Sequence, residues 1–248
     1  MTDEQYESRV ISFPAARGLT AVRETAAAAA VSQLAPGAGG SVDDWGRDPT
    51  LVSWMMRAGR LRWSTLVHGH QRLPTPGGAL VVVNARRYAL TAPFAALALT
   101  EATGRPVRFV GRPDVAPVGA FARRLGGLLD RPDEVAGALR AGELVLMGAR
   151  PELHPRRVGR IDHRLVGAAV ETKTAVFPAA IASSPWARGL RVEIGAALRP
   201  SRRRRGPLIE LELADQLERR IGELLVGLGG AQTGTVLDWL PLSGMGSR

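Results

Sequence analysis

The sequence contains no cysteine, which excludes disulfides, thiolate catalysis and cysteine-ligated zinc. It has a single lysine, Lys173, although lysine and arginine together number 33. No apolar run approaches the ~18 residues of a membrane span, since the longest, residues 92–100, stops at Glu101. The first ten residues are polar and acidic, unlike a secretory signal peptide. We therefore expect a cytoplasmic protein.

Aromatic residues are also scarce, at 5% of the chain. No segment interleaves basic and aromatic residues as single-strand binders do, and no helix-turn-helix, zinc-finger or RNP-like pattern is present, so we expect no nucleic acid partner. The formal net charge is nevertheless +10. A G+C-rich genome explains why arginine replaces lysine, but it does not explain the excess of bases over acids. The charge indicates a phosphorylated substrate or an anionic membrane as partner.

Composition and hydropathy divide the chain into three parts. Residues 1–42 are low in complexity and end in a glycine-rich linker, which predicts a flexible arm; its apolar stretch 10–15 is a candidate docking segment. Residues 43–228 alternate strand and helix patterns, which predicts one α/β domain whose central, mainly parallel sheet is flanked by helices. Residues 229–248 are expected to form a C-terminal tail.

Apolar periodicity and the positions of glycine and proline predict the elements of this domain. The first helix is expected in 48–63, with Asp48 as its N-cap and Pro49 at its first position. The other helices are expected within 91–104, 115–127, 131–142, 160–174 and 206–228. The strands are expected within 64–74, 76–84, 106–112, 143–147, 175–182 and 191–198.

Three stretches, taken in order, carry a resemblance to a known family. They are "HGHQRLPTPGGALVVVN", "FARRLGGLLDRPDEVAGALRAGELVLM", and "TAVFPAAIASS", with Pro178 inside a strand, followed by "LRVEIGAALRP". From about Asp43 to Gly227 the chain resembles the glycerolipid acyltransferases, the superfamily of the lysophosphatidic acid acyltransferases. The resemblance implies their glycerol-phosphate acyltransferase-like α/β fold and a role in phospholipid metabolism.

The residues to which the resemblance would assign catalysis are replaced in this chain. In the family an Asn-His-x4-Asp motif follows a strand; its His takes the proton of a glycerol hydroxyl and its Asp orients the His. Here Asn84 matches the Asn, whereas Ala85 stands at the His position and Leu90 at the Asp position. The family's later Phe-Pro-Glu-Gly motif reads Gly-Ala-Arg-Pro at 148–151, so Arg150 reverses a charge. The comparison implies a pseudoenzyme without catalytic residues, cofactor or metal.

Arginines are expected around the former active-site cleft. Arg86 and Arg87 follow the strand end, Arg131 matches a basic residue of the family's glycerol-phosphate block, and Arg150 follows the later strand. Because guanidinium groups form bidentate contacts with phosphate, these four predict the binding of an anionic lipid or acyl-CoA. A solvated basic rim would have the same sequence pattern.

A second group of arginines precedes the last expected helix, at Arg202, Arg203, Arg204 and Arg205. Such a cluster predicts peripheral contact with the anionic inner face of a membrane, or else an exposed charge run.

Three of the four histidines are candidate functional residues. If His68 and His70 lie in one strand, they share a face and form a His-x-His pair that suits zinc, but a third ligand is not evident. Asp162 and His163 resemble a displaced acid–base pair, yet adjacent helical side chains diverge by about 100°. His163 alone is then a candidate substitute base.

Three functions fit these patterns. The first is a degenerate acyltransferase-like protein that binds a lipid or acyl donor as an accessory, or as the partner of an active acyltransferase relative. The second is an active acyltransferase that transfers an acyl chain from a thioester to a lysophospholipid with unrecognised residues. The third is an interaction module that uses the apolar stretch 10–15 and the arginine-rich surfaces.

Overall fold

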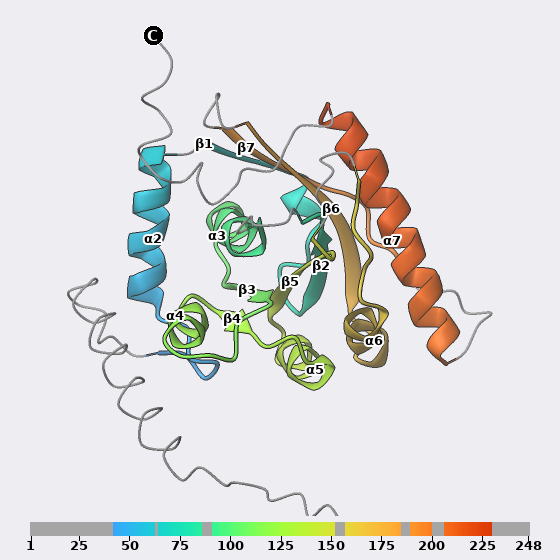
Figure 1. Cartoon of the computed structure of the whole chain (residues 1–248), viewed down its shortest axis with the longest axis horizontal. Coiled ribbons are helices and arrows are strands. Elements are labelled where there is room, and N and C mark those ends of the chain that lie inside the picture. The colour runs from blue at the N-terminus through green and yellow to red at the C-terminus, as the bar shows by residue number, and fades with distance from the viewer. Residues whose placement is uncertain are drawn as a thin grey trace, which may run out of the picture.

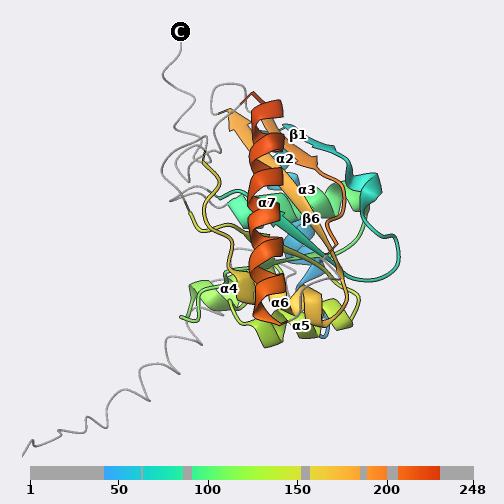
Figure 2. The same cartoon turned by 90° about the vertical axis from the view of Figure 1, so that its right-hand side faces the viewer.

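The computed structural model describes residues 42–62, 64–85, 91–151, 157–184, 189–199 and 206–229. Over these residues, seven strands form one sheet with helices on both faces (Figures 1 and 2). The predicted α/β class and mainly parallel sheet are confirmed. Nearly all of the expected arm (1–42) and tail (229–248) lies outside the described residues, so both stay predictions.

The strands follow the predicted apolar segments. In chain order they are β1 (Ser64–His68), β2 (Ala79–Val83), β3 (Val107–Val110), β4 (Gly127–Leu128), β5 (Leu144–Gly148), β6 (Ala175–Ser184) and β7 (Gly189–Ile194). Their order in the sheet is β1-β7-β6-β2-β5-β3-β4, and neighbours are parallel except for β6 with β7. The two-residue β4 was not predicted, because the sequence pattern placed Gly127 in the closing turn of a helix.

The helices also lie where periodicity predicts them. They are α2 (Pro49–Arg62), α3 (Thr91–Thr103), α4 (Val118–Arg124), α5 (Pro132–Arg140), α6 (His163–Glu171) and α7 (Pro207–Gly227). A 3-10 turn, η1 (His70–Arg72), follows β1. None of the described helices is long and apolar enough to cross a membrane.

The sheet separates two hydrophobic cores because successive strand side chains point to opposite faces. Leu80 and Val82 of β2 pack with buried residues of α5, α6 and α7, whereas Ala79, Val81 and Val83 pack with residues of α3 and α4. Helix α2 lies outside α3 and α4 (Figure 1), and α7 crosses in front of β6 in Figure 2. The buried row of α7 therefore covers the sheet, as its amphipathic pattern predicts.

Asp48 caps α2 as predicted. Its Oδ1 accepts hydrogen bonds from the backbone N of Thr50 at 2.9 Å and of Leu51 at 3.0 Å. Its Oδ2 lies 2.6 Å from Nη2 of Arg124, at the end of α4. The fully buried Asp48 carboxylate thus caps one helix and holds it against another.

Pro178 lies inside the central strand β6, where proline is normally disfavoured. Strand β7 ends at Ile194 beside it, and the N–H of the next residue, Gly195, donates to the Pro178 carbonyl at 2.8 Å. A Cβ on Gly195 would lie 2.9 Å from the proline ring. The chain therefore accommodates Pro178 by breaking the neighbouring strand at a glycine.

Arg108 of β3 is a buried charge that the sequence pattern did not reveal. Its side chain is 1% exposed, and its Nη2 lies 2.6 Å from Oδ2 of Asp43 and 3.2 Å from Oε1 of Glu143. Two residues beyond Asp43, Trp45 packs against Gly137 of α5. These contacts hold the segment before α2 on the domain.

Candidate functional site

A cavity of about 690 Å³ lies at the carboxyl ends of three parallel strands. Ala85 lines it just after β2, Gly111 just after β3, and Ala149 and Arg150 just after β5. This edge of an open α/β sheet is where ligands bind in such folds, and the volume falls within the ~300–1,000 Å³ usual for ligand sites. A cavity is therefore present beside Ala85.

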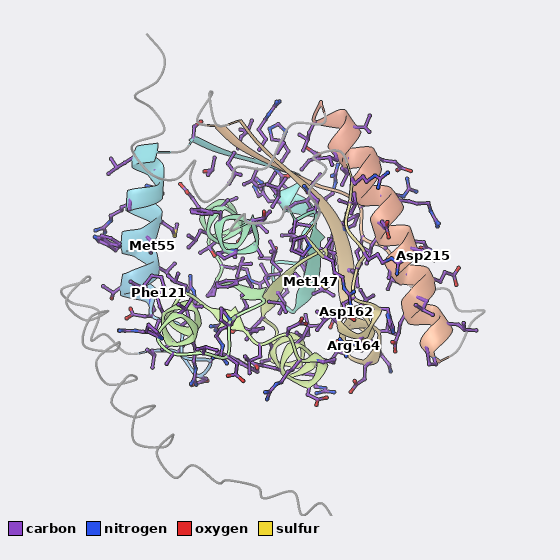
Figure 3. All side chains as sticks on the ribbon, in the orientation of Figure 1. Met55, Phe121, Met147, Asp162, Arg164 and Asp215 are labelled. Carbon is purple, nitrogen blue, oxygen red and sulfur yellow. The ribbon has the colours of Figure 1, made fainter. Side chains whose placement is uncertain are left out.

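One end of the cavity is apolar. Met55 of α2 and Phe121 of α4 line it and lie on the same side of the sheet in Figure 3. The other large apolar lining residues are Phe94, Leu97, Phe109, Val110, Val118, Leu125, Met147 and Leu165. Because most of the lining is hydrocarbon, the cavity suits an apolar group more than a sugar or a nucleotide base.

The charged lining residues are Asp130, Arg150, Asp162 and Arg164. Asp162 is the N-cap of α6: its Oδ1 accepts from the Arg164 backbone N at 3.0 Å, and its Oδ2 lies 2.9 Å from Arg164 Nη2. Figure 3 shows the two side chains together at the start of α6. The hydrogen bonds from Arg164 hold the pKa of Asp162 below its usual value although partial burial opposes this. Asp162 is therefore a weak proton acceptor at neutral pH.

The position of Ala85 is fixed from two sides. The preceding Asn84 bonds through its side chain to the backbone of Ile181 in β6. In β5, a Cβ added to Gly148 would lie 3.3 Å from the Ala85 Cβ, which shows how closely the ends of β2 and β5 approach. Among the described residues that line the cavity none is histidine, so Asp130 and Asp162 are its only carboxylates or imidazoles.

The predicted binding residues differ in their placement. Arg150 lines the cavity with an exposed side chain, and its backbone N donates to the Arg160 carbonyl at 2.8 Å. Arg131, the N-cap residue of α5, is absent from the described lining and pairs instead with Asp114, at 3.4 Å between Nη2 and Oδ2, with both side chains about two-thirds exposed.

Other predicted residues cannot be placed because they lie outside the described residues. These are Arg86, Arg87 and Leu90, which follow β2 in the sequence, and Arg202, Arg203, Arg204 and Arg205, which precede α7 in the sequence. Their roles stay predictions.

The histidine predictions need one correction. β1 ends at His68, Gly69 has a φ of 76°, and His70 begins η1, so the two histidines do not alternate within one strand. His70 Nδ1 lies 3.2 Å from the Val67 carbonyl, and His68 Nδ1 lies 3.9 Å from Oε2 of Glu193. The described residues contain no cluster of three or more His, Asp or Glu suited to a metal. His163, the first residue of α6, is not among the described lining residues.

Two residues of the cavity were missed by sequence reasoning. Arg164 is one of them, and the local signal for it is an arginine two residues after the N-cap aspartate of α6, Asp162. Thr91, at the first position of α3, lines the cavity and is 7% exposed. No local pattern distinguishes such a threonine from an ordinary helix-start residue.

Comparison with known proteins identifies the fold. Neither family models nor curated proteins give a match to the sequence. Among solved structures, the chain is similar to the 1-acyl-sn-glycerophosphate (LPA) acyltransferase PlsC from Thermotoga maritima, with a TM-score of 0.53 and 15% identity over 75% of this chain and 82% of that one. The protein thus has the α/β fold of a glycerolipid acyltransferase, as its sequence predicts.

Proposed function

We propose that this protein is a degenerate glycerolipid acyltransferase that binds a lipid or acyl donor in the cavity and does not turn it over. The observation that supports the proposal is the cavity itself: it persists around Ala85, while its described lining offers no imidazole. A protein that had lost both substrate and reaction would have no need to keep an open, largely apolar cleft at this edge of the sheet.

The chemistry of acyl transfer explains why turnover is not expected. A hydroxyl attacks a thioester efficiently when a base within about 3 Å accepts its proton, and removing a positioned base costs ~10²- to 10⁴-fold in rate. Ala85 supplies no such group. Asp162 is held by Arg164 with a lowered pKa, so it does not replace the imidazole.

The alternative is an active acyltransferase that transfers an acyl chain from a thioester to a lysophospholipid with unrecognised residues. Asp130 and Asp162 are the candidate bases for it, because they are the carboxylates in the described lining. Fold likeness alone does not separate the two functions, since unrelated activities recur on one fold.

The test is to incubate the purified protein with palmitoyl-CoA and lysophosphatidate while CoA release and ligand binding are measured in parallel. We expect saturable binding of at least one ligand, with CoA release at the level of the protein-free control. Sustained CoA release that is lost in Asp130→Asn or Asp162→Asn would establish the alternative. Absence of binding to both ligands would refute the proposal.

The accessory role is a further part of the proposal. It predicts that addition of this protein changes the rate at which an active LPA acyltransferase forms product. An equal volume of the protein's buffer should leave that rate unchanged. If the rate of the active enzyme does not change, the accessory role is refuted, whereas ligand binding by this protein is unaffected by that result.

A further inference from the structure

We infer that the cavity binds a long-chain monocarboxylate, a free fatty acid, with its carboxylate at Thr91 and its chain among the apolar residues of α2, α3 and α4. This inference rests on the proposed function and names the ligand class. Three observations on the described residues carry it: a buried hydroxyl without a partner, a helix start, and the balance of charges in the lining.

The Thr91 hydroxyl is the first observation. Thr91 is 7% exposed, it lines the cavity, and its Oγ1 is buried with no hydrogen-bond partner within the described part of the chain. Elsewhere in α3, the Thr100 hydroxyl donates to the Ala96 carbonyl at 2.8 Å and the Thr103 hydroxyl to the Leu99 carbonyl at 2.7 Å. Thr91 is the first residue of α3 that the structure describes, and no such bond to a carbonyl four residues earlier is found for it among the described residues. Since buried hydroxyls are nearly always paired, a ligand oxygen is the missing acceptor.

The start of α3 is the second observation. The first four residues of this 13-residue helix, 91–94, all line the cavity. A helix carries a partial positive charge at its N-terminus, which favours a negative group there. The hydroxyl and the helix dipole therefore act on the same ligand atoms.

The charges of the lining are the third observation, and they select the head group. Asp130 and Asp162 contribute two negative charges, and Arg150 and Arg164 contribute two positive ones. Arg164 is already engaged with Asp162. The described lining thus holds no surplus cation to neutralise a doubly charged phosphate monoester, whereas one carboxylate suits the partial charge at α3.

The remaining lining accommodates the chain. Met55, Leu97, Phe109, Phe121 and Leu125 belong to or flank α2, α3, β3 and α4. Val118 of α4 also lines the cavity and is 59% exposed, so the apolar surface continues to the outside. Binding of an alkyl chain here becomes more favourable in proportion to the apolar surface area that is removed from water.

The experiment is calorimetric titration of the full chain with palmitate, with monohexadecyl phosphate as the ligand of equal chain length and higher charge. Wild type should bind palmitate more tightly than the phosphate. Thr91→Val, which removes the hydroxyl at nearly constant volume, should weaken palmitate binding about tenfold or more, as expected for a hydrogen bond to a charged group. Thr91→Ser should retain near wild-type affinity.

Thr103→Val is the matched control, because it removes a hydroxyl from the same helix that already bonds within the helix; its palmitate affinity should equal that of wild type. Ala122→Trp, which fills the apolar end from α4, should weaken both ligands. If Thr91→Val fails to fold, Thr91→Ala compared with Thr91→Ser makes the same measurement.

Equal palmitate affinity of wild type and Thr91→Val would overturn the head-group site, as would tighter binding of the phosphate. If wild type binds palmitoyl-CoA or lysophosphatidate but not palmitate, this inference fails while the proposed function stands. If none of these ligands binds, both fail.

Discussion

The side-chain amide of Asn84 bonds both backbone polar groups of Ile181: Nδ2 donates to the carbonyl at 3.1 Å, and the Ile181 N–H donates to Oδ1 at 2.7 Å. The last registered pair between β2 and β6 is Val83 with Ala179, so this amide continues the strand pairing by one further link. Asn84, at 5% exposure, therefore fixes the backbone that leads into Ala85. This structural role needs no imidazole beside it.

Asn84→Ala should lower the free energy of unfolding by about 2–3 kcal/mol, because two buried backbone groups of Ile181 lose their partners. Urea denaturation of the purified protein measures this. Gln71→Ala, at an exposed position of η1, is the control and should change stability by less than about 0.5 kcal/mol. Equal stability of the two variants would remove the role that we assign to Asn84.

Arg108→Met should destabilise the fold by about 2–3 kcal/mol. Removing one partner of a buried ion pair typically costs about 3–5 kcal/mol, and the smaller figure applies because Asp43 keeps about a third of its side-chain exposure and can hydrate. Arg60→Met removes the pair with Glu101, in which Arg60 is largely exposed, and should cost less than about 1 kcal/mol. Denaturation curves that coincide for the two variants would contradict this prediction.

Stability should fall in acid because two carboxyl groups have lowered pKa values. Burial opposes the shift at Asp43, but hydrogen bonds and charge from Arg108 outweigh it; at Asp162 the hydrogen bonds from Arg164 dominate. A lowered folded-state pKa contributes stability above the ordinary value of 3.8, and this contribution is lost as pH falls through the folded-state value.

The free energy of unfolding, measured from pH 6 down to pH 2, should therefore decline most steeply below about pH 4. Asp162→Asn keeps an N-cap side chain but cannot titrate, so its decline should be shallower than that of wild type. Asp133→Asn, at an exposed position of α5, should follow wild type. An Asp162→Asn profile parallel to wild type would contradict the assignment.

The combined substitutions Ala85→His, Leu90→Asp and Arg150→Glu should produce measurable CoA release from palmitoyl-CoA and lysophosphatidate. Ala85 already lines the cavity, as does Gly148 beside it. The double variant without Ala85→His is the matched control and should stay inactive. A folded, ligand-binding triple variant with no activity would show that the cleft no longer complements the reaction.

Replacement of Arg202, Arg203, Arg204 and Arg205 by serine should abolish co-sedimentation with anionic vesicles, since each arginine contributes about 1 kcal/mol near such a surface. Wild-type binding should weaken as salt is raised. The pair Arg219→Ser and Arg220→Ser, at exposed positions of α7, removes two charges outside the cluster and should bind more strongly than the pair Arg202→Ser and Arg203→Ser, which removes the same charge within it. Co-sedimentation that is independent of the lipid charge and of the salt concentration would exclude peripheral attachment through this cluster.

The sequence by itself determined the α/β alternation, most element positions and the cap at Asp48. It also determined the identity of Ala85 and Leu90, which the resemblance places at the family's His and Asp positions. Each of these depends on neighbours within one helix or strand, or on residue identity at one position. The sequence did not predict the strand β4, because two residues are too few to show a hydrophobic periodicity.

Tertiary structure alone decided that Ala85 faces an open cavity, that Arg131 pairs with Asp114 away from its described lining, and that Arg108 is buried. It also decided that Thr91 is left without a partner among the described residues. Asn84 and Ile181 are 97 residues apart in the chain. Such relationships arise when distant segments pack together, and no local pattern of residues encodes the contact that each side chain finally makes.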